Sequence, residues 1–213
     1  MKITTLIFNP FQESTYVLWH EDGKDAFLVD PGMMMQAERD LFAEFIERHH
    51  LNITKIILTH IHIDHVIGVA WASKKYGASI EFSEQDNAML NIMNLQVAMM
   101  GLDVKFEQFD ASNYLHDGDL LNLNGETIKV LEVPGHSRGS LAFYAPQSKK
   151  VITGDALFCG SIGRTDLPGG SYEQLINSIT SKLITLPDDT DVYPGHGECT
   201  TISQEKRFNP FLR

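Results

Sequence analysis

The residues best suited to chemistry are three histidines and an aspartate in one short segment, His60, His62, Asp64 and His65. Held neutral in an apolar loop, each imidazole would leave a nitrogen lone pair unpaired, which costs roughly 1–3 kcal/mol. A divalent metal uses those lone pairs, and imidazole and carboxylate are ligands that zinc, iron and manganese accept. The segment contains no cysteine, which argues against a closed structural zinc site. The pattern predicts a metal pair with an open position for water, against the alternative of an exposed strand with alternating polar residues.

Three further candidates follow apolar runs later in the chain. They are His136, Asp155 and His196, each directly after a glycine. Alone, each pattern is typical of a turn. A site at one edge of a sheet requires this arrangement repeatedly, because glycine lets the backbone turn sharply and approach a metal closely. Together with the His60 segment, these three residues predict a single site.

The pattern Thr-His-x-His-x-Asp-His at residues 59–65, with the three later ligands at strand ends, resembles the metallo-β-lactamase superfamily. Residues 9–12, 160–170 and 209–212 resemble those of short glyoxalase-II-like hydrolases. The resemblance covers essentially the whole chain and implies an α+β fold, the αββα four-layer sandwich, with the metal site at one edge of the two sheets. Glyoxalase II itself has a helical C-terminal domain that supplies much of its glutathione pocket, whereas only residues 197–213 follow His196 here. We therefore expect a single domain over residues 1–213, without a helical glutathione-binding domain.

The same resemblance implies two divalent metal ions, zinc in the first place, with iron or manganese as alternatives. It assigns His60, His62 and His136 to one metal, Asp64, His65 and His196 to the other, and Asp155 to the bridge between them. The implied activity is hydrolysis of a small thioester, such as a hydroxyacylglutathione, or of an ester, by a metal-bridging hydroxide that Asp64 or Asp155 orients. A thiol leaving group has a pKa of about 8.5 and needs no strong general acid. This fits the sequence, which offers no clear candidate for a general acid.

Three other functions stay open at this point. By resemblance, a persulfide dioxygenase of the same superfamily uses a single iron held by residues matching His60, His136 and Asp155, a set of two histidines and one carboxylate. A nuclease of this fold is disfavoured by the acidic composition. A metal-binding scaffold without activity is the third. Metal counting tests the dioxygenase, a gel-shift against RNA at low salt tests the nuclease, and a panel of thioesters tests the scaffold.

Arg164 is the candidate for binding a substrate carboxylate, because a guanidinium can donate two parallel hydrogen bonds to it. Its structural alternative is an ion pair with Asp166. Asp30 is interpreted as a turn residue that bonds its own backbone rather than as part of the site. Candidates for the pocket wall are Tyr144, Phe158 and the methionine-bearing stretch 89–100.

Short strands and covering helices must position these residues. Apolar and β-branched runs predict strands at 2–8, 15–20, 25–29, 55–58, 79–82, 105–109, 120–123, 126–133, 140–144, 151–153 and 190–193. Helical spacing predicts helices at 36–50, 66–76, from about 83, and at 172–183. Candidate ligands follow four of the strands, so we expect two packed sheets with helices outside.

Composition limits the partners and the location. The 213 residues are 43% hydrophobic, enough for a sizeable core, and carry a net charge of −11, which repels nucleic acid. No run approaches transmembrane length, and the apolar start is too short for a secretory signal. Two cysteines do not make a disulfide framework, so we expect a cytoplasmic protein that acts on a small molecule, without nucleic-acid or membrane partners. The oligomeric state is not predicted.

Overall fold

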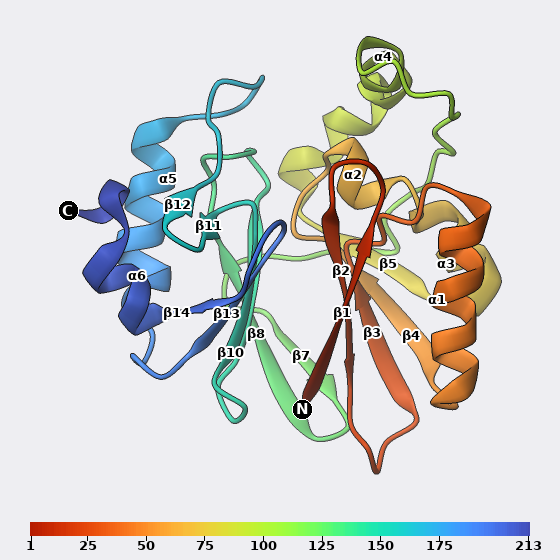
Figure 1. Cartoon of the computed structure of the whole chain (residues 1–213), viewed down its shortest axis with the longest axis horizontal. Coiled ribbons are helices and arrows are strands. Elements are labelled where there is room, and N and C mark those ends of the chain that lie inside the picture. The colour runs from red at the N-terminus through yellow and green to blue at the C-terminus, as the bar shows by residue number, and fades with distance from the viewer.

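Two six-stranded sheets pack face to face in the computed structural model, which describes residues 1–213 (Figure 1). The first has the order β1-β2-β3-β4-β5-β6 and the second the order β14-β13-β10-β9-β8-β7. The strands of the first sheet are β1 (Lys2–Phe8), β2 (Glu13–Trp19), β3 (Asp25–Val29), β4 (Asn52–Ile57), β5 (Ser79–Phe82) and β6 (Asn113–Tyr114). Those of the second are β7 (Leu120–Leu123), β8 (Glu126–Glu132), β9 (Leu141–Ala145), β10 (Lys150–Gly154), β13 (Asp191–Pro194) and β14 (Thr200–Thr201). A separate hairpin pairs β11 (Leu157–Phe158) with β12 (Ser161–Ile162).

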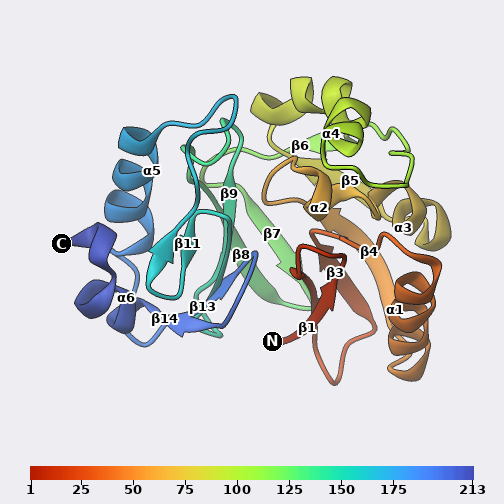
Figure 2. The same cartoon turned by 45° about the horizontal axis from the view of Figure 1, so that its top comes forward.

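Helices cover the outer face of each sheet (Figures 1 and 2). The first sheet carries α1 (Gln36–Arg48) and α3 (Val69–Tyr76), and the second carries α5 (Tyr172–Ser178), the π-helical turn η2 (Ile179–Leu183) and α6 (Ile202–Phe208). The remaining segments are α2 (Ile63–Val66), the 3₁₀ segment η1 (Glu84–Ile92), α4 (Met93–Met99) and the 3₁₀ turn η3 (Pro210–Leu212). None of these helices has the length and apolar character needed to cross a bilayer.

Three apolar clusters separate the layers. Phe27 of β3 and Phe143 of β9 belong to the cluster between the two sheets. Phe42 of α1 belongs to the cluster under the first pair of helices, and Leu175 of α5 to the cluster under the second. This succession of helix, sheet, sheet and helix confirms the predicted α+β fold and its αββα sandwich.

Strand direction brings the ligand-bearing loops to one edge. β3, β4 and β5 are parallel to one another, and β10 is parallel to β13. β8 runs in the same direction as β10, because both are antiparallel to β9. The loops after β4, β8, β10 and β13 therefore leave their sheets at carboxyl ends, where function-bearing loops gather on a rigid scaffold.

The structure differs from the prediction in several places. Residues 102–111 form no strand, so the strand predicted at 105–109 is wrong: Phe106 and Phe109 pack as core side chains, and the short β6 occupies the sheet edge. The helix predicted at 66–76 is interrupted at Gly68, whose N–H donates to the carbonyl of Pro31 at 2.8 Å. The short elements β6, β11, β12, β14, α6 and η3 were not predicted, because each is too short to produce a clear periodic pattern.

Candidate metal centre

The seven candidate ligands converge at the shared edge of the two sheets. The first sheet contributes His60 and His62 from the loop after β4, and Asp64 and His65 from α2. The second sheet contributes His136 after β8, Asp155 after β10 and His196 after β13. The structure thus brings together residues that lie up to 136 positions apart in sequence, counted from His60 to His196.

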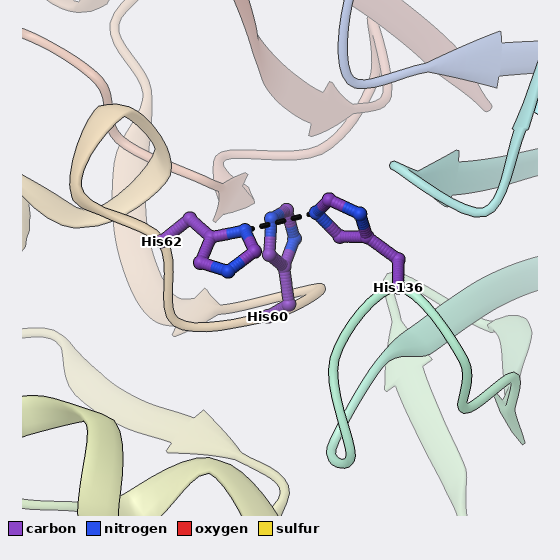
Figure 3. A group of neighbouring side chains, drawn as sticks. All are labelled: His60, His62 and His136. Atoms are coloured by element: carbon purple, nitrogen blue, oxygen red, sulfur yellow. Dashed lines mark hydrogen bonds between the residues drawn. The ribbon is translucent and has the colours of Figure 1, made fainter. Parts of the chain in front are cut away.

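His60, His62 and His136 form one group, whose ligand nitrogens all lie within 4.8 Å of one another. In Figure 3 the rings of His62 and His136 point toward each other from opposite loops, with the ring of His60 beside them. Nδ1 of His62 and Nε2 of His136 are 2.9 Å apart. Nε2 of His60 is buried and has no hydrogen-bond partner. A cation at their meeting point satisfies all three nitrogens.

Asp64, His65 and His196 form a second group with the same spacing. Nε2 of His196 lies 3.2 Å from Oδ2 of Asp64 and 3.2 Å from Nε2 of His65. Asp155 stands between the two groups: its Oδ1 is 3.4 Å from Nε2 of His65, and its Oδ2 is 3.5 Å from Nε2 of His136. Oδ2 also lies 3.7 Å from Nε2 of His196. The carboxylate of Asp155 therefore contacts residues of both groups, which is the position that a bridging ligand requires.

Four of the histidines are oriented by a hydrogen bond at the nitrogen that faces away from the centre. These contacts join His60 Nδ1 to Thr59 Oγ1 (2.9 Å), His65 Nδ1 to Asp30 Oδ2 (3.1 Å), His136 Nδ1 to the Arg164 carbonyl (2.8 Å) and His196 Nδ1 to the Phe11 carbonyl (3.1 Å). Such contacts are typical of metal-binding histidines, because they fix the tautomer and leave the other nitrogen free to bind.

The electrostatics favour neutral imidazoles at His60 and His62 and ionised carboxylates beside them. Burial lowers the pKa of His60, and the neighbouring histidines lower it further. Burial, together with His136, lowers the pKa of His62 to about 4. Burial alone would raise the pKa of Asp64 and of Asp155, but the adjacent His65 lowers both below the usual value. Burial alone would lower the pKa of His65 and of His196, but Asp64 and Asp155 raise both above the usual value. Divalent metals bind neutral imidazole and carboxylate, so a metal pair would take the place of the protons on these two histidines, and the donor set fits it.

Two glycines allow the close approach of backbone and ligands. Gly154 has φ +49°, and a Cβ there would lie 2.4 Å from Thr59 Oγ1. A Cβ on Gly195 would lie 2.1 Å from Asp155 Oδ1. Each of these glycines directly precedes a candidate ligand, because a larger residue would push the loop away from the centre.

Asp30 is the clearest residue that sequence reasoning missed. Its φ of +48° fits the expected turn, yet its side chain is buried and its carboxylate contacts residues of the site. Oδ1 accepts from the Thr59 N–H at 2.7 Å, and Oδ2 accepts from the Thr59 hydroxyl at 2.5 Å and contacts His65 Nδ1. The preference for a turn role alone was therefore wrong. The available signal was its place directly after a buried strand, the same place that the ligands occupy.

Asp86 is a second missed residue, and it ties two ligand loops together. It is buried in η1, with Oδ1 accepting from the Gly139 N–H at 2.7 Å. Its Oδ2 accepts from the Ser137 hydroxyl at 2.7 Å and from the Ile61 N–H at 3.2 Å. The loop that carries His60 and the loop that carries His136 thus share one buried carboxylate. Nothing in the local sequence distinguishes Asp86 from an ordinary acid in the first turn of a helix.

A cavity of about 650 Å³ opens over the metal centre. Arg164 lines it, and its guanidinium donates to Asp166 from Nε at 2.7 Å and from Nη2 at 2.8 Å, so the expected ion pair is present. The methionine-bearing stretch also lines the cavity, whereas Tyr144 and Phe158 do not; the ring of Phe158 instead meets His196 edge-on, 6.4 Å between centroids.

Comparison with known proteins agrees with this geometry. Residues 8–196 match the family model of the metallo-beta-lactamase superfamily. Hydroxyacylglutathione hydrolase GloC from Haemophilus influenzae is 38% identical over 214 residues, which cover 100% of this chain and 98% of that protein. The crystal structure of BLEG-1 B3 metallo-beta-lactamase superposes with a TM-score of 0.89 and 33% identity, covering 99% of each chain. The structure of TTHA1623 in a di-iron-bound form gives a TM-score of 0.85 and 36% identity, covering 98% of this chain and 100% of that one.

Proposed function

Because the chain belongs to the metallo-beta-lactamase superfamily, a family of metal-binding hydrolases, we propose that it is a binuclear metallohydrolase that cleaves small thioesters or esters. The observation that carries the proposal is the position of Asp155, one oxygen toward His65 and the other toward His136. A residue so placed can serve two metal ions at once.

Each proposed ligand has a role that its contacts support. His60, His62 and His136 would hold one ion, Asp64, His65 and His196 the other, and Asp155 would join them. When bound, the ions supply an activated water at neutral pH and polarise the substrate carbonyl. In the metal-free protein His65 lowers the pKa of Asp64 and of Asp155. As ionised ligands, either carboxylate could accept a hydrogen bond from that water and orient it.

The leaving group is inferred from what lines the cavity. Apart from the proposed ligands, Arg164 is the one ionisable side chain there, and it carries no proton that it can release near neutral pH. A thiol has a pKa of about 8.5, so its thiolate can leave without a general acid, whereas an amine cannot. A thioester or an activated ester is therefore favoured, and the name of the Haemophilus relative supports a thioester.

The metal is proposed as zinc or iron. Nitrogen and oxygen ligands suit both, and the similar TTHA1623 is described with two irons. Arg164 stays a proposed substrate contact, since a substrate carboxylate could compete with Asp166 for its guanidinium.

Metal counting after anaerobic purification, followed by a thioester and ester panel, tests the proposal. We expect about two metal ions per chain and hydrolysis that returns when the metal-free protein is reloaded. Asp155→Asn is expected to lower kcat/KM by at least about 100-fold, because the amide removes one anionic oxygen from the pair of sites. Asp189→Asn, a surface change at an exposed ion pair with Lys149, is the matched control.

Two results would overturn the hydrolase. One is a single iron per chain with oxygen uptake on glutathione persulfide, which would identify the dioxygenase. The other is full metal loading with no turnover of any thioester or ester, combined with lower stability of His62→Ala, which would identify a metal-binding scaffold.

A further inference from the structure

The cavity over the metal centre is mainly apolar. Residues of η1 and α4 line it, and α4 lies beside α2 (Figures 1 and 2). From these segments Leu95, Met99 and Met100 line the cavity, although 59%, 79% and 49% of their surfaces are exposed. Phe11, before β2, and Leu167, before α5, also line the cavity. A ligand that covers these large apolar side chains removes them from water, which lowers the free energy of the complex.

The cavity contains few polar groups, and most of them are proposed metal ligands or already make hydrogen bonds. Besides the proposed metal ligands, only Arg164 and Gln96 are polar among the lining residues. The guanidinium of Arg164 already makes two hydrogen bonds to Asp166. Arg138, another cation nearby, lies beside Gly169 and does not line the cavity. A carrier with two carboxylates, such as glutathione, would therefore meet one cation that is already paired.

The wall is also suited to fit ligands of different shape. Methionine is unbranched and flexible, so Met99 and Met100 can adapt to apolar groups of several sizes. The volume of about 650 Å³ lies within the range of small-molecule sites, which are commonly apolar with a few polar groups that fix orientation.

We propose that this cavity selects thioesters or esters that carry an uncharged apolar group of several carbons, in preference to those of glutathione. The inference rests on the hydrolase function proposed above and specifies its substrate class. The apolar group would lie against Leu95 and Met99, while the carbonyl carbon reaches the metal centre beside Asp155.

The test compares chain length and carrier separately. Acetyl and hexanoyl thioesters of N-acetylcysteamine, a small neutral thiol, are compared with the same two thioesters of glutathione. Each buried methylene favours binding by about four-fold, so we expect kcat/KM to rise at least ten-fold from acetyl to hexanoyl on the neutral carrier. For each acyl group we expect the neutral carrier to exceed glutathione.

Leu95→Asp and Ala98→Asp form a matched pair on α4. Leu95 lines the cavity and Ala98, one turn further along the helix, is exposed and does not line it, so the same charge is added at a lining and at a non-lining position. Leu95→Asp is expected to lower kcat/KM for the hexanoyl thioester at least ten-fold and to change that for the acetyl thioester less than two-fold. Ala98→Asp is expected to change neither by more than two-fold.

Binding of the non-hydrolysable S-hexyl-N-acetylcysteamine, measured by calorimetry against its S-methyl analogue, separates the two proposals. Tighter S-hexyl binding that Leu95→Asp abolishes supports the apolar site. If no substrate turns over in the same protein, only the hydrolase proposal is contradicted. Turnover without chain-length dependence, or a preference for glutathione thioesters, overturns the apolar site and leaves the hydrolase standing. Equal binding of the two analogues also overturns it.

Discussion

Individual side chains at this centre contact neighbouring residues through both of their polar atoms. His65 directs Nε2 toward His196 and Asp155, and its Nδ1 contacts Asp30. Asp30 in turn accepts from the backbone and hydroxyl of Thr59. Thr59 and His65 are therefore held by the same carboxylate, which limits how far either side chain can rotate.

Replacing Asp30 by Asn should weaken metal binding at the Asp64, His65 and His196 group by about 10- to 100-fold. The amide nitrogen cannot accept a hydrogen bond, so either Thr59 or His65 loses its partner. Metal titration of the chelated protein measures the effect. Asp25→Asn, at an exposed carboxylate that bonds Asn52, serves as the control. Unchanged affinity in a folded Asp30→Asn protein would contradict the role assigned to this residue.

At the scale of elements, the ligand loops are connected to one another as well as to their strands. Asp86 of η1 joins the loop after β4 to the loop after β8. The Leu141 N–H at the start of β9 donates to the Thr59 carbonyl at 2.7 Å, which joins the two sheets at the same edge. These contacts hold the loops in place before any metal binds.

Asp86→Ala should lower the free energy of unfolding by about 3 kcal/mol, because it leaves buried N–H and hydroxyl donors on both ligand loops without an acceptor. Urea unfolding of the metal-free protein measures the change. Glu84→Ala, an exposed residue in the same turn of η1, should change stability by less than about 0.5 kcal/mol. Equal stabilities of the two variants would show that Asp86 does not connect the loops energetically.

Asp117, in the loop before β7, provides a pH-dependent link to η2. Its Oδ1 accepts from Lys182 Nζ at 2.6 Å and from the Glu132 N–H at 2.9 Å. Burial opposes ionisation, but these hydrogen bonds and the charge of Lys182 lower its pKa below the usual value. A lowered folded-state pKa gives stability that is present above the unfolded pKa, about 3.9, and is lost as the pH falls below it.

Asp117→Asn should therefore destabilise the protein at pH 6 by no more than about 1 kcal/mol, since the pair is largely exposed. The difference between the two proteins should shrink as the pH falls to about 3. Thermal unfolding at the two pH values measures it, with Asp110→Asn, at an exposed carboxylate without an ion pair, as the comparison. A difference that grows in acid would reverse the assigned sign.

For the whole molecule, the metal centre lies where the two halves of the sandwich meet. Four candidate ligands come from the first sheet and three from the second. The same edge is joined directly, because the Tyr16 hydroxyl of β2 donates to the Pro194 carbonyl of β13 at 2.5 Å. A metal bound there contacts both halves only when they are packed, so it stabilises the native state selectively.

Chelation should lower the melting temperature by about 10 °C. A ligand present at 1,000 times its Kd contributes about 4 kcal/mol, and each kcal/mol corresponds to about 2–4 °C in a protein of this size. Calorimetry with and without chelator measures the shift. Phe143→Ala, in the core between the sheets, should lower the melting temperature but keep the chelator effect, whereas Asp155→Asn should lose most of it. A metal-loaded protein that melts at the same temperature with chelator would refute this coupling.

The sequence by itself determined the local part of the site. The spacing of His60, His62, Asp64 and His65 is set by bond geometry within seven residues, and the apolar runs that end at His136, Asp155 and His196 are local patterns too. Strands such as 2–8, 25–29 and 79–82 were predicted at their observed bounds for the same reason.

Only the tertiary structure decided which distant groups meet. The contacts of Asp30 and Asp86 and the apolar wall of Leu95 and Met99 depend on the packing of segments tens of residues apart. Local sequence does not encode such contacts, because they arise from the burial of whole faces rather than from the preferences of neighbouring residues. The stretch 105–109 illustrates this: its apolar residues satisfy the core as irregular chain, although their local pattern favours a strand.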